Sequence, residues 1–206
     1  MIVVQHGTGP SLDLHKSFGK STKDWAESHN CVYIYSEQRI CPDRSPHWEK
    51  PKLMLDLMRG AMGTDFLWAD TDIFVVRKEV SPVGVLQDWA DLAMCMDRAT
   101  PFNSGLFFIR SNERTIAYMQ DVVDKGPIIG TAYHDQSRMC EQLQFHPIRL
   151  QVLPWEWNQA HCTNCFRGSN TIQKPIIEAY HGCPKEYAHW RMQGHMNSKR
   201  ISLKGA

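Results

Sequence analysis

Short apolar segments alternate with amphipathic ones in the first third of the chain. Residues 2–4 form an apolar run that ends at a Gly- and Pro-containing loop, and Cys31 to Tyr35 (CVYIY) form a second run. Both runs are typical of buried strands. Between them, Ser21 has an Asp three residues later, which is the pattern of a capping box. We therefore expect a helix from Ser21 to Asn30, followed after the second run by a polar loop over residues 36–47.

A second helix and a third strand follow this loop. Pro51 suits the first turn of a helix, where its missing N–H matters least. Four apolar residues between Met54 and Ala61 recur at the spacing of one buried helical face. We expect this helix to end at Gly63 and the next strand to cover residues 66–69. The order strand, helix, strand, helix, strand predicts an α/β fold with a mostly parallel sheet flanked by helices.

The second half of the chain continues this alternation before it becomes irregular. Residues 106–109 (LFFI) read as a strand, and residues 112–125 as a helix closed by Gly126. A short helix over residues 135–143 and a short strand at residues 152–153 complete the pattern. The last fifty residues are rich in Trp, His, Cys and Gly, so we expect them to wrap around the sheet. The prediction is one domain over residues 1–206.

The composition of the chain mainly argues against certain partners and locations. The chain has 206 residues, 42% of them hydrophobic and 22% charged, with a net charge of +1. Such a balance gives no field that would favour nucleic acid as a partner. No apolar run approaches the about 18 residues of a membrane span, and the N-terminus lacks the features of a secretion signal. We therefore expect a cytoplasmic setting. The seven cysteines are mostly dispersed, as buried reduced thiols would be.

Two aspartates separated by one residue, Asp70 and Asp72, directly follow the predicted strand over residues 66–69. Ligands of open α/β sheets bind beyond the carboxyl ends of the strands, so both carboxylates would stand at the rim of a cleft. Two converging carboxylates repel each other unless a cation or a proton lies between them. Hard oxygen ligands favour Mg²⁺ or Mn²⁺, which commonly bind the phosphates of a substrate. The alternative is a solvated turn whose aspartates cap backbone amides.

The segment LWADTDIFVV resembles the Asp-x-Asp segment of glycosyltransferases with the GT-A fold, which use nucleotide-sugar donors. Upstream, KDWAESHNCVYIYSE and HWEKPKLMLDLMRGAMG are similar to the galactomannan galactosyltransferase and xyloglucan xylosyltransferase group. Downstream, PFNSGLFFIR resembles the Asn-x-Gly strand of the retaining GT-A enzymes, and HDQSRMCEQL resembles their Asp-Gln helix start. These segments stand in the family's order and span residues 23–143.

This resemblance implies a metal site and a site for the diphosphate. Asp72 would bind Mn²⁺ or Mg²⁺, and Asp70 would contact the metal or the ribose. His181 would complete the metal site, and Lys185 would reach the diphosphate, although the family spaces its His, Gly and Lys more widely than HGCPK. Two other histidines could replace the first one, His189 and His195. The implied partners are a nucleoside-diphosphate-sugar donor, with UDP expected, and a glycan or glycoprotein acceptor.

The resemblance also implies a sugar-binding site. Asn103, Ser104 and Gly105 would line the donor sugar, although a turn before the strand would also explain them. Asp135 would bind sugar hydroxyls, and Gln136 would lie near the anomeric carbon. The resemblance alone implies retention of anomeric configuration. Because an amide is a weak nucleophile, a front-face substitution fits such a site better than a double displacement.

Further candidate substrate contacts are expected at three places in the chain. Thr8, in the loop after the first strand, would contact the nucleobase or ribose. Lys50, in the Trp-x-Lys segment, would bind substrate. Trp155 and Trp157 would stack on an acceptor sugar or pack in the core. Because plant members of the group carry a membrane anchor, the sequence also fits a soluble catalytic domain cut from a larger, possibly virus-encoded, protein.

Two other functions compete with this hypothesis. A haloacid-dehalogenase-like phosphatase would use Asp70 as nucleophile and Asp72 as general acid with Mg²⁺. It would carry Thr or Val at the position of Phe74, and its motif would lie near the N-terminus.

A zinc-binding interaction module is the second alternative. Its ligands would be a Cys-x-x-Cys and a His-x-Cys about sixteen residues later, Cys162, Cys165, His181 and Cys183. The short gap of the second pair is a cramped geometry for one zinc ion.

Overall fold

The apolar runs of the sequence build a central six-stranded sheet in the computed structural model, which describes residues 1–97, 100–132, 134–160, 174–180 and 190–193. In spatial order the strands are β2 (Val32–Ser36), β1 (Ile2–His6), β3 (Asp65–Ala69), β6 (Phe102–Arg110), β5 (Leu92–Met96) and β7 (Leu150–Leu153). Strand β6 runs antiparallel to both neighbours, whereas the other neighbouring pairs are parallel. The prediction of a mostly parallel α/β sheet is confirmed.

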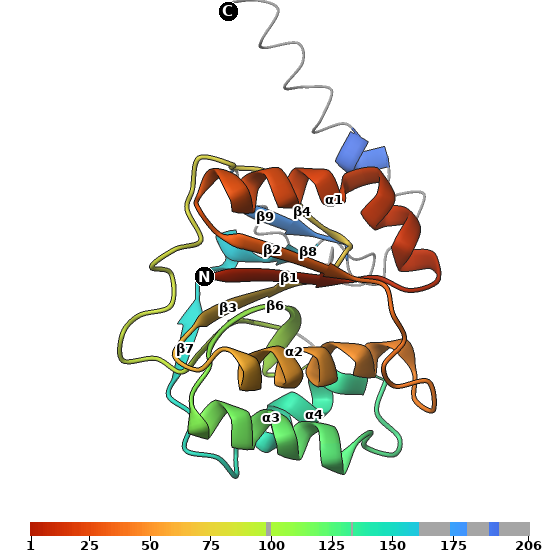
Figure 1. The fold of residues 1–206 in the computed structure, drawn as a ribbon, viewed down its shortest axis with the longest axis vertical. Coiled ribbons are helices and arrows are strands. Elements are labelled where there is room, and N and C mark those ends of the chain that lie inside the picture. Colours follow the sequence, from red (N-terminus) through yellow and green to blue (C-terminus); the bar gives the residue numbers. More distant parts are fainter. Residues whose placement is uncertain (98–99, 133, 161–173, 181–189, 194–206) are drawn as a thin grey trace, which may run out of the picture.

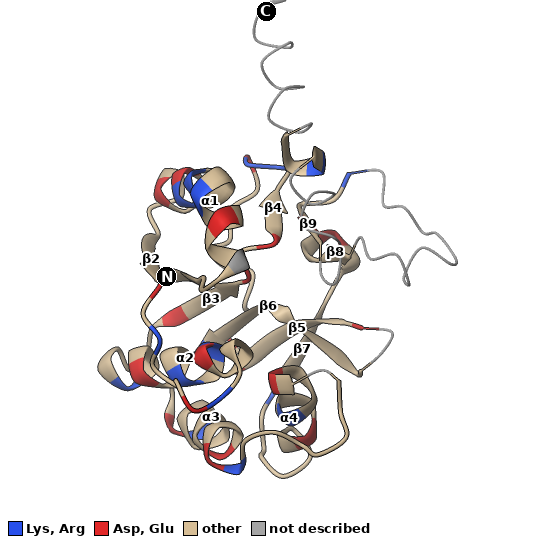
Figure 2. Ribbon diagram, turned by 90° about the vertical axis from the view of Figure 1, so that its right-hand side faces the viewer, with Lys and Arg blue, Asp and Glu red and all other residues tan. Residues whose placement is uncertain are grey.

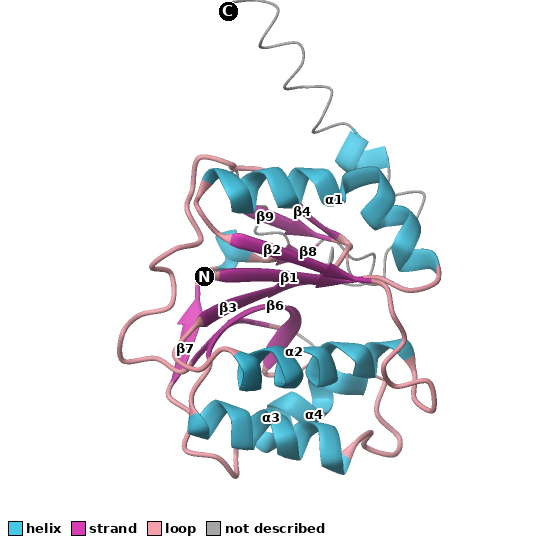
Figure 3. Ribbon diagram, in the orientation of Figure 1, coloured by secondary structure: helices cyan, strands magenta, loops and turns pink. Residues whose placement is uncertain are grey.

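Helices and a second small sheet cover the two faces of the central sheet (Figure 1 and Figure 3). On one face lie α1 (Pro10–Ser28) and a three-stranded sheet in the order β4 (Ile73–Val75), β9 (Ile177–Ala179) and β8 (Gln159–Ala160). On the other face lie α2 (Glu49–Gly60), α3 (Glu113–Lys125) and α4 (His134–Gln142). Two 3₁₀ turns, η1 (Pro46–Trp48) and η2 (Trp155–Trp157), precede α2 and β8.

Successive side chains of the strands pack into two separate hydrophobic cores, one on each face of the sheet. Val3 packs on the face covered by α1, in the same cluster as Trp25, while Val4 packs with Met54 of α2 and Tyr118 of α3. This alternation follows from the two-residue period of a strand, which turns successive side chains to opposite faces. The four central strands are therefore largely buried on both sides, as their apolar runs indicated. The prediction of a buried strand is wrong for β2, which lies at the edge of the sheet and exposes Val32 by 59%.

The predicted helix boundaries are right in the second half and wrong near the start. Helix α3 has Asn112 as its N-cap, in a capping box with Thr115, and Gly126 follows its last residue with φ +61°. Helix α1 instead begins at Pro10, so Ser21 lies inside the helix and caps nothing. The capping-box pattern at Ser21 was misleading because a proline at the first turn already starts the helix eleven residues earlier.

Strand β6 is longer than predicted, and strand β5 was not predicted. Asn103, Ser104 and Gly105 lie within β6 rather than in a turn before it. Strand β5 has the sequence LAMCM, whose Leu, Ala and Met favour helices. It forms a strand because it is held between β6 and β7, where four of its five residues are buried. The short strands β4, β8 and β9 were also not predicted.

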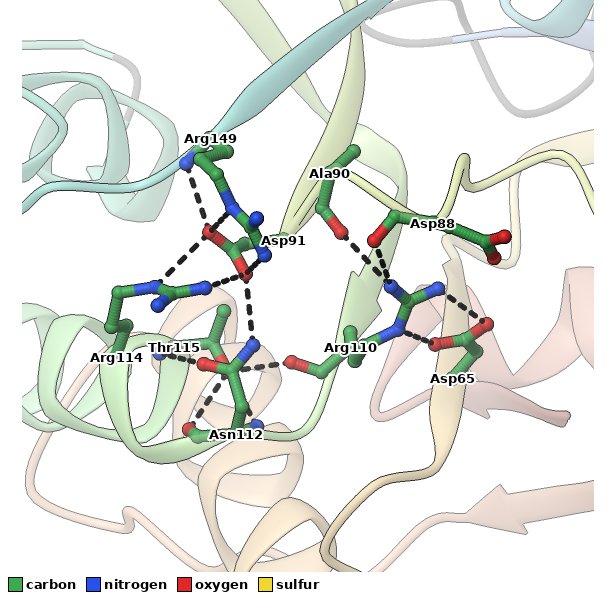
Figure 4. Close-up of polar contacts among 9 residues, drawn as sticks. All are labelled: Asp65, Asp88, Ala90, Asp91, Arg110, Asn112, Arg114, Thr115 and Arg149. Atoms are coloured by element: carbon green, nitrogen blue, oxygen red, sulfur yellow. Dashed lines mark hydrogen bonds and ion pairs between the residues drawn. The ribbon is translucent and has the colours of Figure 1, made fainter.

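A network of ion pairs fastens the amino ends of the parallel strands (Figure 4). Asp91, directly before β5, is fully buried and accepts hydrogen bonds from Arg114 (2.7 Å), Arg149 (3.0 Å) and Asn112 (2.9 Å). Burial alone would raise the pKa of Asp91, but the bonds from Arg149 and Arg114 outweigh it and hold this pKa well below its ordinary value. The network stabilises the amino ends of these strands, and the Asp-x-Asp segment follows the opposite, carboxyl end of β3.

The surface carries both signs of charge. Acidic and basic residues are interspersed over the helices, in keeping with the net charge of +1 (Figure 2). Within the described part of the chain, no helix has the length and apolar character to cross a membrane. Four cysteines, Cys31, Cys41, Cys95 and Cys140, are buried free thiols, as predicted for them.

Candidate active site

Asp70 is held at the carboxyl end of β3 by residues of the two neighbouring strands and of β3 itself. Its backbone N–H donates to the carbonyl of Gly105 in β6 (2.8 Å), and its own carbonyl accepts from the side chain of Gln5 in β1 (3.1 Å). Its carboxylate accepts from the indole N–H of Trp68 at 2.7 Å. Both the backbone and the side chain of Asp70 therefore have fixed positions at the rim of the sheet.

Lys50 joins Asp70 to Asp135 across the site. Its ammonium lies 3.2 Å from a carboxylate oxygen of Asp70 and 3.1 Å from one of Asp135. It also donates to the carbonyl (3.0 Å) and the hydroxyl (3.2 Å) of Ser104. Burial alone would lower the pKa of Lys50, but Asp135 and Asp70 outweigh it and raise this pKa above its ordinary value. The ammonium is thus a permanent cation whose three N–H groups are all engaged by the protein.

Asp135 and Gln136 begin α4 and reach strand β6. The hydroxyl of Ser104 donates to Asp135 (3.1 Å), and the backbone N–H of Ser104 donates to the side-chain oxygen of Gln136 (2.9 Å). The amide nitrogen of Gln136 donates to Asp97 (3.0 Å) and to Thr100 (2.6 Å). The structure therefore brings together five residues expected from the sequence: Lys50, Asp70, Ser104, Asp135 and Gln136.

Asp97 is a site residue that the sequence analysis missed. The same carboxylate oxygen accepts from Gln136 (3.0 Å) and from the side chain of Asn103 (2.9 Å). The side-chain oxygen of Asn103 accepts from the backbone N–H of Gly105 (2.8 Å) and from Asn158 (2.9 Å). A signal was present, because Asp97 directly follows the buried run of β5 just as Asp70 follows β3.

Glu49 is a second residue that the sequence analysis missed. It is fully buried at the start of α2 and accepts from Arg39 (2.6 Å) and from the backbone N–H groups of Ile40 (2.7 Å) and Cys41 (3.1 Å). Such a carboxylate fixes the polar loop that leads from β2 into α2. The first turn of α2 therefore carries both the anchor of this loop and, at the next position, Lys50.

His47 and His134 form a stacked pair that links the same segments. Their ring centroids are 4.3 Å apart and the rings are inclined by 8°. His47 lies in η1, three residues before Lys50, and His134 opens α4 with φ +39°. A positive φ at a residue other than glycine is uncommon and costs free energy, so packing must hold it. The stack helps to keep the start of α4 against the segment that carries Lys50.

Asp72 lies in the turn between β3 and β4, beside the C-terminal part of the chain. Its carbonyl accepts a hydrogen bond from the backbone N–H of Tyr180 at 2.9 Å, where β9 runs antiparallel to β4. Tyr180 directly precedes His181, the expected third metal ligand. His181 itself lies outside the described residues, as do Lys185, His189 and His195.

Asp70 and Asp72 offer the carboxylate oxygens that Mn²⁺ and Mg²⁺ prefer. Among the residues that the structure describes, no three His, Cys, Asp or Glu side chains form a group that could hold a metal ion. A complete ligand set would therefore draw on further residues, as the sequence analysis expected of His181. The four expected zinc ligands, Cys162, Cys165, His181 and Cys183, lie outside the described residues.

Thr8 lies in the loop between β1 and α1, and its carbonyl accepts from the backbone N–H of Ser11 (3.2 Å). The loop is packed tightly against the Asp-x-Asp turn. A Cβ atom on Gly7 would lie 3.1 Å from the Tyr35 hydroxyl and 3.3 Å from a methyl group of Thr71. Only glycine fits there without displacing a neighbour. These short distances place the loop of Thr8 against Tyr35 at the end of β2 and against Thr71, the residue between Asp70 and Asp72.

The two candidate tryptophans have different environments. Trp157 is 6% exposed and packs edge-on against Phe108 with ring centroids 5.4 Å apart, so it belongs to the core. Trp155 is 44% exposed and follows the end of β7. Of these two tryptophans, Trp155 is the one that is open to a ligand.

Comparison with known proteins shows the family to which this chain belongs. A family model described as nucleotide-diphospho-sugar transferase matches residues 45–180, which is more than half of the chain. The chain therefore belongs to this family and is a glycosyltransferase, so the phosphatase hypothesis is not supported. The matched segment begins just before η1 and ends at Tyr180, and so includes both aspartates and α4. A comparison with curated proteins gives no match.

Solved glycosyltransferases share the fold at low sequence identity. A glycosyltransferase involved in the glycosylation of the major capsid of PBCV-1 has a TM-score of 0.75 and 13% identity, covering 93% of this chain and 98% of that one. The galactosyltransferase LgtC, in complex with donor and acceptor sugar analogues, has a TM-score of 0.55 and 14% identity, covering 96% of each chain. Mouse xyloside xylosyltransferase 1 has a TM-score of 0.51 and 10% identity, covering 88% and 98%. The prediction of a GT-A fold is confirmed.

Proposed function

We propose that this glycosyltransferase moves a hexose or pentose from a UDP-sugar to a hydroxyl group of a glycan or glycoprotein, with Mn²⁺ or Mg²⁺ and with retention of anomeric configuration. The observation that carries the proposal is the hydrogen bond between Tyr180 and Asp72 (2.9 Å). It sets the residue before His181 against the Asp-x-Asp turn. The proposed metal ligands would therefore be a carboxylate pair from one segment and a histidine from a second segment that is far away in sequence.

Asp72, Asp70 and His181 would hold the metal. When bound, the metal would offset the negative charge that develops on the departing diphosphate. The loop of Thr8, which adjoins the same turn, would bind the nucleobase or ribose, and Lys185 would reach the diphosphate. The tight approach of Gly7 to Thr71 supports this placement of the nucleotide.

The residues of α4 and β6 would bind the donor sugar. Lys50 has all its N–H groups engaged by Asp70, Asp135 and Ser104. Its role is thus to hold both carboxylates in place, and Asp135 would accept hydrogen bonds from sugar hydroxyls. Asn103 and Gly105 would line the same pocket.

The environment of Gln136 supports a front-face substitution. Its amide donates to Asp97 and Thr100 and accepts from Ser104, so the side chain is held in one orientation. A neutral amide held in this way would stabilise charge near the anomeric carbon but would be a weak nucleophile. The leaving phosphate would then take the proton of the acceptor hydroxyl, and the new bond would form on the face that the phosphate leaves.

Calorimetric titration with UDP and with GDP, each with and without Mn²⁺, tests the proposal. We expect UDP to bind only when Mn²⁺ is present, and GDP to bind at least about tenfold more weakly. Anomer-resolved NMR of the hydrolysis or transfer product of the accepted UDP-sugar then tests retention. Equal affinity for UDP with and without metal would refute the metal site. Tightly held zinc in the purified protein would instead support the zinc module.

A further inference from the structure

Trp68 contacts both members of the ion pair at the centre of the site. Its indole N–H donates to Asp70 at 2.7 Å, and the Lys50 ammonium lies 5.8 Å from the centre of its ring. The side chain is 2% exposed and stacks with Phe107 at a centroid distance of 6.5 Å. The edge of one ring thus contacts the carboxylate, while its face lies within the range of a cation–π contact with the ammonium.

We propose that Trp68 is a positioning residue for the reaction, and that its indole N–H fixes the carboxylate of Asp70 for the metal and the donor. The inference rests on the proposed function, because it assigns Trp68 to the same site. Trp68 touches neither reacting atom and acts through Asp70.

The side chain of Asp70 has one conformational freedom that a hydrogen-bond donor can restrict. Its backbone is fixed on both sides by Gly105 and Gln5, so only the rotation of its side chain is left to set. Lys50 shares its ammonium among Asp70, Asp135 and Ser104, so its hold on Asp70 is divided. The indole of Trp68 has one N–H, and that N–H is committed to Asp70. A distance of 2.7 Å lies at the short end for a charge-assisted bond.

Burial makes this donor rigid. A lysine side chain can follow a carboxylate that turns, whereas a buried indole stacked on Phe107 of the neighbouring strand cannot follow it. Packing alone would need only an apolar ring at this position. The hydrogen bond is therefore the property of tryptophan that phenylalanine lacks here, and a Trp68→Phe variant separates the two contributions.

The chain offers a matched control in Trp25. This tryptophan is 1% exposed in the other core, and its indole N–H donates to the carbonyl of Val80 at 2.9 Å. Trp25→Phe makes the same chemical change, with loss of one buried indole hydrogen bond, in a cluster that does not include Trp68. It reports the effect of losing an indole and its buried hydrogen bond in a core that does not contain Trp68.

The experiment measures Mn²⁺ affinity in the presence of UDP by electron paramagnetic resonance, and donor hydrolysis over a range of Mn²⁺ concentrations. Loss of a group that orients a metal ligand typically lowers metal affinity about 10- to 100-fold. We expect a loss in this range for Trp68→Phe, with kcat largely restored at saturating Mn²⁺, and a change below about twofold for Trp25→Phe. Equal Mn²⁺ affinity in Trp68→Phe and wild type, or equal losses in both variants, would overturn the inference.

A second measurement needs no Trp68 variant. In resonance-assigned wild-type protein, we expect Mg²⁺ with UDP to shift the indole N–H signal of Trp68 and to leave that of Trp25 in place. An unmoved Trp68 signal in a protein that binds UDP with Mg²⁺ would overturn the positioning role while the proposed function stands. Absence of metal-dependent UDP binding by wild type would refute the proposed function, and the inference with it.

Discussion

The ammonium of Lys50 lies 3.1 Å from the carboxylate of Asp135, and both groups are buried. Lys50 comes from the first turn of α2, whereas Asp135 comes from the first turn of α4. Two helices that are far apart in sequence are therefore joined at the rim of the sheet. The pair also reaches Asp70, so one cation lies between the metal side and the sugar side of the proposed site.

Replacement of Lys50 by Met is expected to damage both stability and activity. Removal of one partner from a buried ion pair leaves an uncompensated charge and typically costs about 3–5 kcal/mol. The free energy of unfolding in urea should fall by this amount, and donor hydrolysis should be lost. Lys52→Met is the control, because Lys52 is a partly exposed residue paired with Asp56 one turn later, a contact worth about 0.3–0.5 kcal/mol. Similar unfolding curves for the two variants would contradict the central role of Lys50.

Replacement of Asp97 by Ala is expected to lower kcat more than it changes the KM for the donor. Asp97 accepts from both Gln136 and Asn103, so its loss frees two amides that line the proposed sugar pocket. We expect kcat to fall about 10- to 100-fold, as for other groups that orient a site. Thr100→Val removes the other acceptor of the Gln136 amide N–H groups and should change kcat in the same direction. A change confined to KM would show instead that Asp97 acts only in donor binding.

The sequence predicted the parts of this site that follow from local pattern. The strand before Asp70 and the capped helix after Asn112 are each defined by contiguous residues, and the structure confirms both. Strand β5 was missed because Leu, Ala and Met carry no local preference for a strand, and its pairing with β6 and β7 decides its conformation. Asp97 was missed with it, because the apolar run that it follows was not recognised as a strand.

The partners of Lys50 could not be predicted from local pattern either. A resemblance assigned Lys50 to substrate binding, but its contacts with Asp70, Asp135 and Ser104 depend on how α2 and α4 pack against β3 and β6. Sequence spacing carries no information about such contacts. The same limit applies to Trp68, which read only as an apolar member of a buried strand until its indole N–H was placed beside Asp70.

The two tryptophans near residue 156 should respond differently to substitution by Ala. Trp157 is buried against Phe108, and loss of such a ring typically costs about 3–5 kcal/mol. Trp155 is 44% exposed, so Trp155→Ala should leave the urea unfolding midpoint nearly unchanged. If Trp155 stacks on the acceptor, the KM for the acceptor should rise while donor hydrolysis stays constant. An unchanged acceptor KM would remove Trp155 from the acceptor site.

Replacement of Asp72 by Asn is expected to abolish donor turnover and leave the fold intact. The amide keeps the shape of the side chain but removes the charge that a divalent metal requires. Calorimetry should therefore detect no Mn²⁺-dependent binding of UDP, while the thermal midpoint stays close to that of wild type. Asp56→Asn, at an exposed carboxylate on α2, provides the control. Near-normal hydrolysis by Asp72→Asn would refute the metal role of the Asp-x-Asp segment.

Replacement of Asp91 by Asn is expected to change how stability depends on pH. Hydrogen bonds from Arg149 and Arg114 hold the pKa of Asp91 below its ordinary value, so the folded protein binds a proton there less readily than the unfolded chain does. The stabilisation is complete above the ordinary carboxylate pKa of about 3.9 and is lost as the pH falls through that value toward the lower folded pKa. At pH 7 the variant should lose about 2–3 kcal/mol of stability, because the two arginines keep only part of their hydrogen bonding. Between about pH 5 and pH 3 its urea midpoint should fall less steeply than that of wild type. Parallel slopes for wild type, Asp91→Asn and the Asp56→Asn control would show that Asp91 contributes nothing to acid unfolding.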